Sequence, residues 1–167
     1  MAVGFDLYCQ LLKQAVAQLK GGKARARLDV EVRLDFVATN EAEFAQLGPE
    51  ARVPAFTPAQ FIADPVLRIQ AHRHLAEITT REQWDRLRKD WRDRFGKFPP
   101  PVDNLLVLTE IKLAAAKAGV TRVEVREGKL MLTRRGDFIL VEGKFPRIST
   151  GRLDHRLNEV LELVKKL

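Results

Sequence analysis

Three histidines are the residues of this chain best suited to metal binding or acid–base catalysis. His72 and His74 are two residues apart, a spacing that points their side chains about 200° apart on a helix. They cannot share one ligand face, and His155 lies far along the chain with no carboxylate cluster near it. The spacing therefore indicates structural or surface histidines and predicts no metal site.

Asp90 and Asp93 form a second pair with a spacing suited to chemistry, because residues i and i+3 project from the same face of a helix. Acid–base catalysis by a carboxyl group requires burial, which favours the neutral form. Arg86, Arg94 and Lys97 lie close by in the sequence and favour ionised carboxylates. The pair therefore predicts a recognition surface and no catalytic residue.

The other common motifs for catalysis and cofactor binding are absent from the sequence. Gly21-Gly22-Lys23 lacks the preceding strand and the following hydroxyl residue of a phosphate-binding loop, and no Gly-x-Ser-x-Gly nucleophile elbow occurs. Cys9 is the single cysteine, which excludes an internal disulfide and a cysteine zinc cluster, and we expect it to pack within a helix. We expect no enzymatic activity and no cofactor for this chain by itself.

The formal net charge of +7 makes nucleic-acid binding the alternative function, because lysine and arginine neutralise phosphates. The 29 basic residues are interleaved with 22 acidic ones, a pattern typical of solvated surfaces. Residues 20–27 are the densest exception, with four cations and no acid. Lys20, Lys23, Arg25 and Arg27 are therefore either part of a helix cap and linker or contacts to phosphate.

Two helices position the aspartate pair. Asp64 before Pro65 predicts the start of the first, because the aspartate accepts an unpaired amide and proline suits the first helical position. Thr80 and Gln83 form a capping box that predicts the start of the second. The aspartates then lie on this second helix.

An apolar stripe on the second helix predicts which side of it is buried. The stripe consists of Trp84, Leu87, Trp91 and Phe95. Gly96 supplies the conformation that ends a helix, and the three prolines that follow cannot continue it. A third, mostly buried helix is predicted over residues 102–118. The aspartates point away from the stripe and toward solvent.

The remaining segments predict a single α+β domain with a mainly antiparallel sheet and several helices packed on it. We expect helices over 3–19 and from residue 153, a strand over 28–36, an irregular excursion with about one helical turn over Thr39–Phe61, and antiparallel strands around 120–125, 130–132 and 138–141. Glu127-Gly128 and Arg135-Gly136 are turn signals between these last strands. No membrane span or secretory signal is evident, so we expect a cytoplasmic protein.

Several short motifs occur in an order similar to that of one bacterial family. They are Ile62–Ile69, Arg73–Ala76, Asp93–Gly96 with the prolines after it, and Asn104–Leu106. With these motifs the chain resembles the C-terminal domain of the bacterial transcription-repair coupling factor, Mfd. Residues 2–8 are similar to the end of the RecG-like translocation motif that precedes this domain. The resemblance implies an N-terminal helix over 1–20 that follows the motif, and the C-terminal α+β domain over 21–167.

The resemblance also implies a function. The parent protein would be an ATP-dependent DNA translocase that removes stalled RNA polymerase and recruits excision repair. In this family the C-terminal domain docks on the UvrB-homology module of the same protein, covers the surface used by UvrA and keeps the resting protein autoinhibited. ATP and magnesium would belong to the motor domains of the parent, and the fragment itself would bind DNA weakly or not at all.

The resemblance places the docking contacts on Asp90 and Asp93, with arginines of the partner module as counterparts. The helix that carries them would be supported by Trp84, Leu87, Trp91, Arg94, Phe95 and Gly96. Residues 80–97 hold seven basic and four acidic residues. The aspartates would therefore act as local contacts in positive surroundings.

Overall fold

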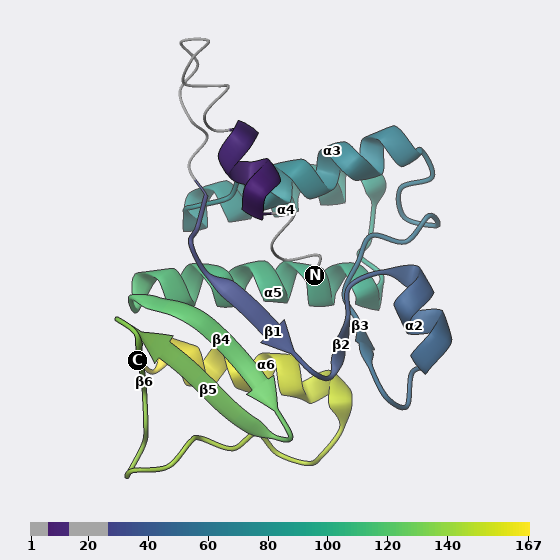
Figure 1. Ribbon diagram of the computed structural model, residues 1–167. Coiled ribbons are helices and arrows are strands. Elements are labelled where there is room, and N and C mark those ends of the chain that lie inside the picture. Colours follow the sequence, from purple (N-terminus) through teal and green to yellow (C-terminus); the bar gives the residue numbers. More distant parts are fainter. Residues whose placement is uncertain (1–6, 14–26) are drawn as a thin grey trace.

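The computed structural model describes residues 7–13 and 27–167 (Figure 1). Residues 7–13 are helical, in agreement with the N-terminal helix predicted over 3–19. The other residues of that helix, and most of the predicted 1–20 segment, lie outside the described part. The later elements are β1 (Glu31–Leu34), β2 (Val37–Ala38), α2 (Glu41–Leu47), β3 (Val53–Pro54), α3 (Pro65–Ala76), α4 (Arg81–Phe95), α5 (Pro100–Lys117), β4 (Val120–Arg126), β5 (Lys129–Arg134), β6 (Asp137–Phe138) and α6 (Leu153–Lys165). No helix within these described residues is long and apolar enough to cross a membrane.

The main sheet has four strands in the order β1-β4-β5-β6. β4, β5 and β6 form the predicted antiparallel meander, although β6 (Asp137–Phe138) is shorter than the strand predicted over 138–141. β1 runs parallel to β4. Glu127, Gly128, Arg135 and Gly136 all have positive φ angles, which is the geometry of two-residue hairpin turns. The α+β class predicted from the sequence is confirmed.

The predicted strand over 28–36 is shorter than expected but keeps its alternation. Leu34 and Phe36 are buried, while Arg33 and Asp35 are exposed. After Leu34 the chain turns, and Val37 begins β2, which pairs with β3 in a small parallel sheet. The turn moves the chain from the main sheet toward the excursion that precedes α3.

The excursion over Thr39–Phe61 is more regular than predicted, because it contains a two-turn helix and a strand. The Asn40 side chain accepts a hydrogen bond from the Glu43 amide at 2.8 Å, and the Glu43 carboxylate accepts one from the Thr39 amide at 3.2 Å. This reciprocal capping starts α2. The prediction of one helical turn was wrong, because the cap formed by Asn40 and Glu43 starts a helix of seven residues.

Helix α5 lies between the sheet and the helical layer formed by α3 and α4 (Figure 1). On one side, Ile111 and Ala115 pack in the core formed with the sheet and α6. On the other, Val102 and Leu106 pack in the core formed with α3 and α4. A single helix therefore connects the sheet to the helix that carries the predicted recognition residues.

Candidate protein-interaction site

The two ends of α4 are defined by the local signals predicted from the sequence. The Thr80 hydroxyl accepts a hydrogen bond from the Gln83 amide at 3.2 Å, and the Gln83 side chain accepts one from the Thr80 amide at 3.2 Å. Gly96 ends the helix with φ 88° and ψ −156°, a conformation available almost only to glycine. The capping box and the glycine stop thus determine the length of the helix.

The buried side of α4 is the predicted aromatic stripe. Trp84 and Trp91 are 3% and 2% exposed, and Leu87 and Phe95 are partly buried beside them. Phe61 packs against this stripe, with ring centroids 6.4 Å from Trp91 and 5.5 Å from Phe95. These contacts fix the rotation of α4 about its axis, so its opposite side faces solvent.

Trp84 also ties α4 to α5. Its indole Nε1–H donates a hydrogen bond to the Leu106 carbonyl oxygen at 3.2 Å in the buried interior. A buried indole nitrogen requires such a partner, because leaving it unpaired costs free energy. The hydrogen bond fixes the position of the first turn of α4 along the axis of α5.

Asp90 and Asp93 are both exposed, as predicted, but their surroundings differ. The Asp90 carboxylate forms an ion pair with Arg94 at 3.3 Å, and its side chain is 56% exposed. Asp93 makes no ion pair or side-chain hydrogen bond within the described residues. Asp93 is therefore the carboxylate more readily available to an external cation.

A shallow hollow of about 360 Å³ lies between the C-terminal end of α3 and α4. It is lined by His74, Glu77, Ile78, Gln83, Arg86, Leu87, Asp90 and Trp91. Asp90 lines this hollow and Asp93 does not. The structure thus separates the predicted pair, because Asp90 lies in the hollow and Asp93 lies outside it.

Four of the arginines on α4 lie over aromatic rings. Arg81 and Arg88 lie 4.3 and 5.3 Å from the Trp84 ring, and Arg94 lies 5.0 Å from the Phe95 ring. Arg92 lies 5.8 Å from the Phe98 ring. Guanidinium groups over ring faces make favourable contacts while staying solvated. Part of the net positive charge of α4 therefore comes from arginines that pack on aromatic rings of the same domain.

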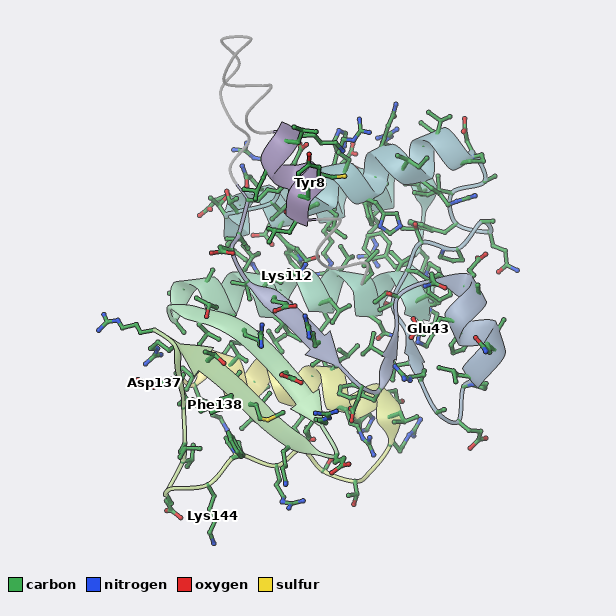
Figure 2. All side chains as sticks on the ribbon, in the orientation of Figure 1. Tyr8, Glu43, Lys112, Asp137, Phe138 and Lys144 are labelled. Atoms are coloured by element: carbon green, nitrogen blue, oxygen red, sulfur yellow. The ribbon has the colours of Figure 1, made fainter. Side chains whose placement is uncertain are left out.

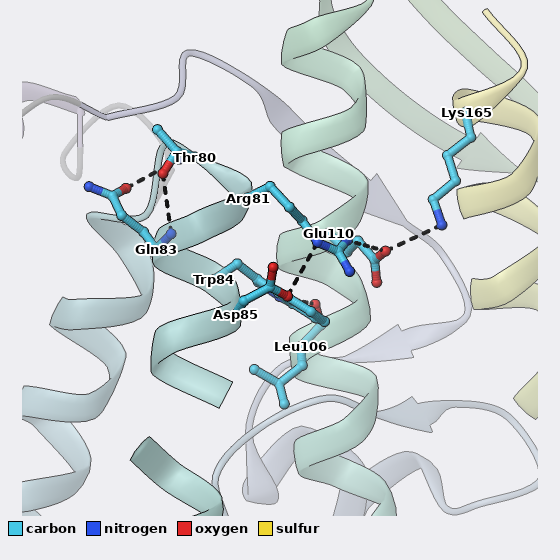
Figure 3. A network of polar contacts seen from close by, with 8 residues as sticks. All are labelled: Thr80, Arg81, Gln83, Trp84, Asp85, Leu106, Glu110 and Lys165. Carbon is cyan, nitrogen blue, oxygen red and sulfur yellow. Dashed lines mark hydrogen bonds and ion pairs between the residues drawn. The ribbon is translucent and has the colours of Figure 1, made fainter. Parts of the chain in front are cut away.

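Glu110 of α5 joins α4 and α6 (Figure 3). Its carboxylate accepts a hydrogen bond from Arg81 at 2.6 Å and lies 3.2 Å from the Lys165 ammonium. Burial by itself raises the pKa of Glu110, but the hydrogen bonds from Arg81 and Lys165 outweigh it and lower the pKa below its ordinary value. The carboxylate is thus a charged link between three helices.

The histidines do not converge. The His72 Nε2 atom lies 2.7 Å from the Thr57 hydroxyl, and desolvation followed by the nearby Arg68 lowers the pKa of this ring. His74 lines the hollow beside α4, and His155 lies on α6. In the described part of the chain no group of three or more histidine, cysteine, aspartate or glutamate residues could hold a metal ion.

The predicted basic run lies almost wholly outside the described residues. Lys20, Lys23 and Arg25 belong to the part that the structure does not describe, and Arg27 is exposed at the start of the described segment. Cys9 is half-buried within the helical residues 7–13. The phosphate contacts proposed for the run are thus still a prediction.

Several structural residues around the site were not predicted from the sequence. Glu110, Thr57 and Asn104 form hydrogen bonds to residues distant in the sequence, and Asn104 Nδ2 donates to the Pro54 carbonyl at 2.9 Å. Glu110 carried one signal, since it is one of the few charged residues in a mostly apolar helix. Such a residue needs a cation, but the sequence does not say which one.

The fold and the site define a small α+β domain in which one central helix joins a mixed sheet to a helical layer with an exposed charged helix. Residues 51–137 match the model of the TRCF domain family. The chain belongs to this family.

Named relatives agree with the family. The chain is 30% identical over 123 residues to a transcription-repair-coupling factor of Staphylococcus haemolyticus, and the alignment covers 74% of this chain and 9% of that protein. It is 30% identical over 125 residues to the one of Escherichia coli, with 75% and 10% covered. The chain thus spans about a tenth of the length of the curated relatives it matches.

A solved structure shares the fold. The crystal structure of a C-terminal domain of transcription-repair coupling factor aligns with a TM-score of 0.53 at 17% sequence identity. The alignment covers 82% of this chain and 95% of that domain. This likeness shows that the two domains share a fold, while the family match over residues 51–137 confirms the resemblance noted in the sequence.

Proposed function

We propose that this chain is the C-terminal regulatory domain of a transcription-repair coupling factor, and that α4 is its docking helix. It would bind the UvrB-homology module of the same protein and cover the surface that UvrA uses. The parent would be an ATP-dependent DNA translocase acting on stalled RNA polymerase, with ATP and magnesium bound by its motor domains. The domain itself would supply no catalytic group.

The observation that carries this proposal is the division of α4 into a buried aromatic side and an exposed charged side. Trp84 and Trp91 hold the helix firmly, so Asp90 and Asp93 are presented on a rigid surface. A rigid charged surface loses little conformational entropy on binding. Val66 and Ile69, which are 60% and 59% exposed on the neighbouring α3, add apolar area that can exclude water from a docked partner.

The two aspartates are expected to contribute unequally. Asp90 already has Arg94 as its partner at 3.3 Å, so an arginine of the module would have to share or displace that contact. Asp93 has no such competitor in the described part of the chain. Charge pairs that become desolvated at interfaces couple by about 1.5–7 kcal/mol, compared with roughly 0.2–1 kcal/mol when exposed. We therefore expect Asp93→Ala to weaken docking more than Asp90→Ala.

Calorimetric titration of the chain with the UvrB-homology module of its parent, at low salt, tests the proposal. The single variants and Asp90→Ala/Asp93→Ala should weaken binding, whereas Glu50→Ala, which removes an exposed carboxylate between α2 and β3, should not. The thermal midpoints should stay unchanged, because these side chains are exposed. Unchanged affinity of the double variant would overturn the assignment.

A titration with duplex DNA distinguishes this proposal from the nucleic-acid alternative. The alternative predicts strong binding that falls steeply with rising salt, because released counterions dominate such affinities. We expect little binding of the isolated chain at about 50 mM salt. Tight duplex binding that Asp90→Ala/Asp93→Ala leaves unchanged would favour the alternative.

A further inference from the structure

The segment between β6 and α6 forms a well-defined loop at the edge of the sheet. Val141 and Lys144 exchange two backbone hydrogen bonds of 2.9 and 3.0 Å across a turn in which Glu142 and Gly143 both have positive φ angles. This is the geometry of a tight two-residue hairpin. After the hairpin, the Leu130 amide donates to the Pro146 carbonyl at 2.8 Å, which returns the chain to β5. The loop is therefore held at its tip and at its base.

This loop and β6 expose several large apolar side chains. Phe138 is 56% exposed, Leu140 48% and Val141 56%. The Phe138 and Phe145 rings pack edge to face with centroids 5.3 Å apart. Phe138, Leu140 and Phe145 line a groove of about 510 Å³ at the base of the loop. A contiguous exposed apolar surface of this kind marks an interaction site.

Three cations surround the apolar groove. They are Lys129 at the start of β5, Lys144 in the hairpin and Arg147 opposite Lys129. Figure 2 shows Lys144 on the part of the loop that extends away from the sheet. None of the three forms an ion pair or side-chain hydrogen bond with another described residue, whereas Arg122, also of this sheet, contacts Glu31 at 2.9 Å. The groove therefore combines an apolar floor with three cations that form no ion pair within the described residues.

We propose that this groove binds an acidic peptide segment of a partner protein. An aromatic or branched aliphatic side chain of the segment would pack on Phe138, Leu140 and Phe145. Carboxylates on either side of that anchor would pair with Lys129, Lys144 and Arg147. A buried apolar anchor within a rim of opposite charge supplies both affinity and orientation.

The groove is separate from the docking helix. It lies at the β5–β6 edge of the sheet, whereas α4 packs on the opposite side of α5 (Figure 1). A partner could therefore occupy the groove while α4 is docked. The proposal stands independently of the role of Asp90 and Asp93.

The chemistry of the groove favours a peptide over single-stranded nucleic acid. Nucleic acid requires a continuous positive track for its backbone and open ring faces on which bases stack. Here Asp137 and Glu142 are exposed beside the groove and interrupt the positive charge. The edge of one ring, Phe138 or Phe145, packs on the face of the other, which leaves less open ring surface for stacking.

Fluorescence anisotropy with the 167-residue chain tests the proposal. The probe is a short labelled peptide in which one phenylalanine and one leucine are flanked by glutamates and aspartates. Lys144→Glu/Arg147→Glu should weaken its binding about tenfold, since two attractive rim pairs become repulsive. Phe138→Ser should weaken it to a similar degree, because the anchor loses its apolar floor. The amide signals of Gly143 and Lys129 should shift on titration.

Matched controls separate this binding from general charge attraction. Lys97→Glu/Lys117→Glu makes the same charge change on two exposed lysines that do not line the groove, and it should alter binding less than about twofold. A peptide with serines in place of phenylalanine and leucine should not bind. The proposal is overturned if the probe does not bind, if Lys144→Glu/Arg147→Glu and Phe138→Ser bind it as the unmodified chain does, or if oligo(dT) competes for these residues with higher affinity.

Discussion

Replacing Glu110 by glutamine tests how the helix that carries the proposed docking surface is held. The Glu110 side chain is only 14% exposed, and it contacts Arg81 of α4 at 2.6 Å and Lys165 of α6 at 3.2 Å. Glutamine has nearly the same shape but no charge. The substitution therefore removes the ionic part of the link and leaves the packing of α5 intact.

The expected loss of unfolding free energy follows from the exposure of the partners. Hydrogen bonds to charged groups contribute about 1.5–3 kcal/mol when well shielded. Arg81 and Lys165 are 52% and 43% exposed, and the glutamine oxygen can still accept from Arg81. We therefore expect a loss of about 1–2 kcal/mol, which for a chain of this size lowers the thermal midpoint by roughly 2–8 °C.

The pH dependence gives a second test of the same contact. Because the pKa of folded Glu110 lies below its ordinary value of 4.5, its stabilisation is fully present above about pH 4.5 and is lost as the pH falls through the folded pKa. Urea unfolding from pH 7 to pH 3 should show the Glu110→Gln difference constant near neutrality and smaller in acid. The closest control is Glu162→Gln, because Glu162 contacts the same Lys165 at 3.6 Å but is 63% exposed. It should cost less than about 0.5 kcal/mol.

Two results would refute this reasoning. One is a Glu110→Gln loss no larger than that of Glu162→Gln, which would mean that the burial of the carboxylate adds nothing. The other is a loss that stays constant down to pH 3, which would mean that it does not arise from the ionised carboxylate.

Two further substitutions test the end of α4 and the contact that joins α5 to β3. Gly96→Ala should cost about 1–3 kcal/mol through backbone strain alone, since φ is +88° and nothing lies within 4 Å of an added methyl group. Gly151→Ala, at a glycine whose φ lies outside the left-handed region, should change stability by less than about 0.5 kcal/mol, and equal costs in urea titrations would contradict the strain argument. Asn104→Ala removes the 2.9 Å hydrogen bond to the Pro54 carbonyl and should cost about 1 kcal/mol. Amide exchange of Val53 should accelerate relative to that of Val123, and unchanged exchange would show that this contact does not hold β3.

Local signals predicted much of the candidate site. Thr80 and Gln83 cap α4 as their spacing predicted, and Trp84 and Trp91 are buried as the helical period required. Such features depend on residues that lie within a few helical turns of one another, so a short stretch of sequence is enough to predict them. The third meander turn, at Glu142, resembles the Glu127 turn in sequence and could have been found the same way.

Contacts between distant residues could not be predicted in this way. The parallel pairing of β1 with β4 joins Val32 to Val123, and alternation along a strand says nothing about which strand lies next to it. The capping signal of α2 was present at Asn40 but was obscured by the surrounding prolines and glycine. The partner of Glu110 on α6 lies 55 residues away, at Lys165.

The sequence by itself determined the family, the α+β class and the existence of a capped helix with a buried aromatic stripe and exposed aspartates. The tertiary structure decided that Asp90 lines a hollow beside α3 while Asp93 stands outside it. It also decided that Lys129, Lys144 and Arg147 surround one apolar groove. The physical reason is that helix caps and periodic stripes arise from local backbone geometry. Grooves and the cations that line them depend on which distant segments the fold places side by side.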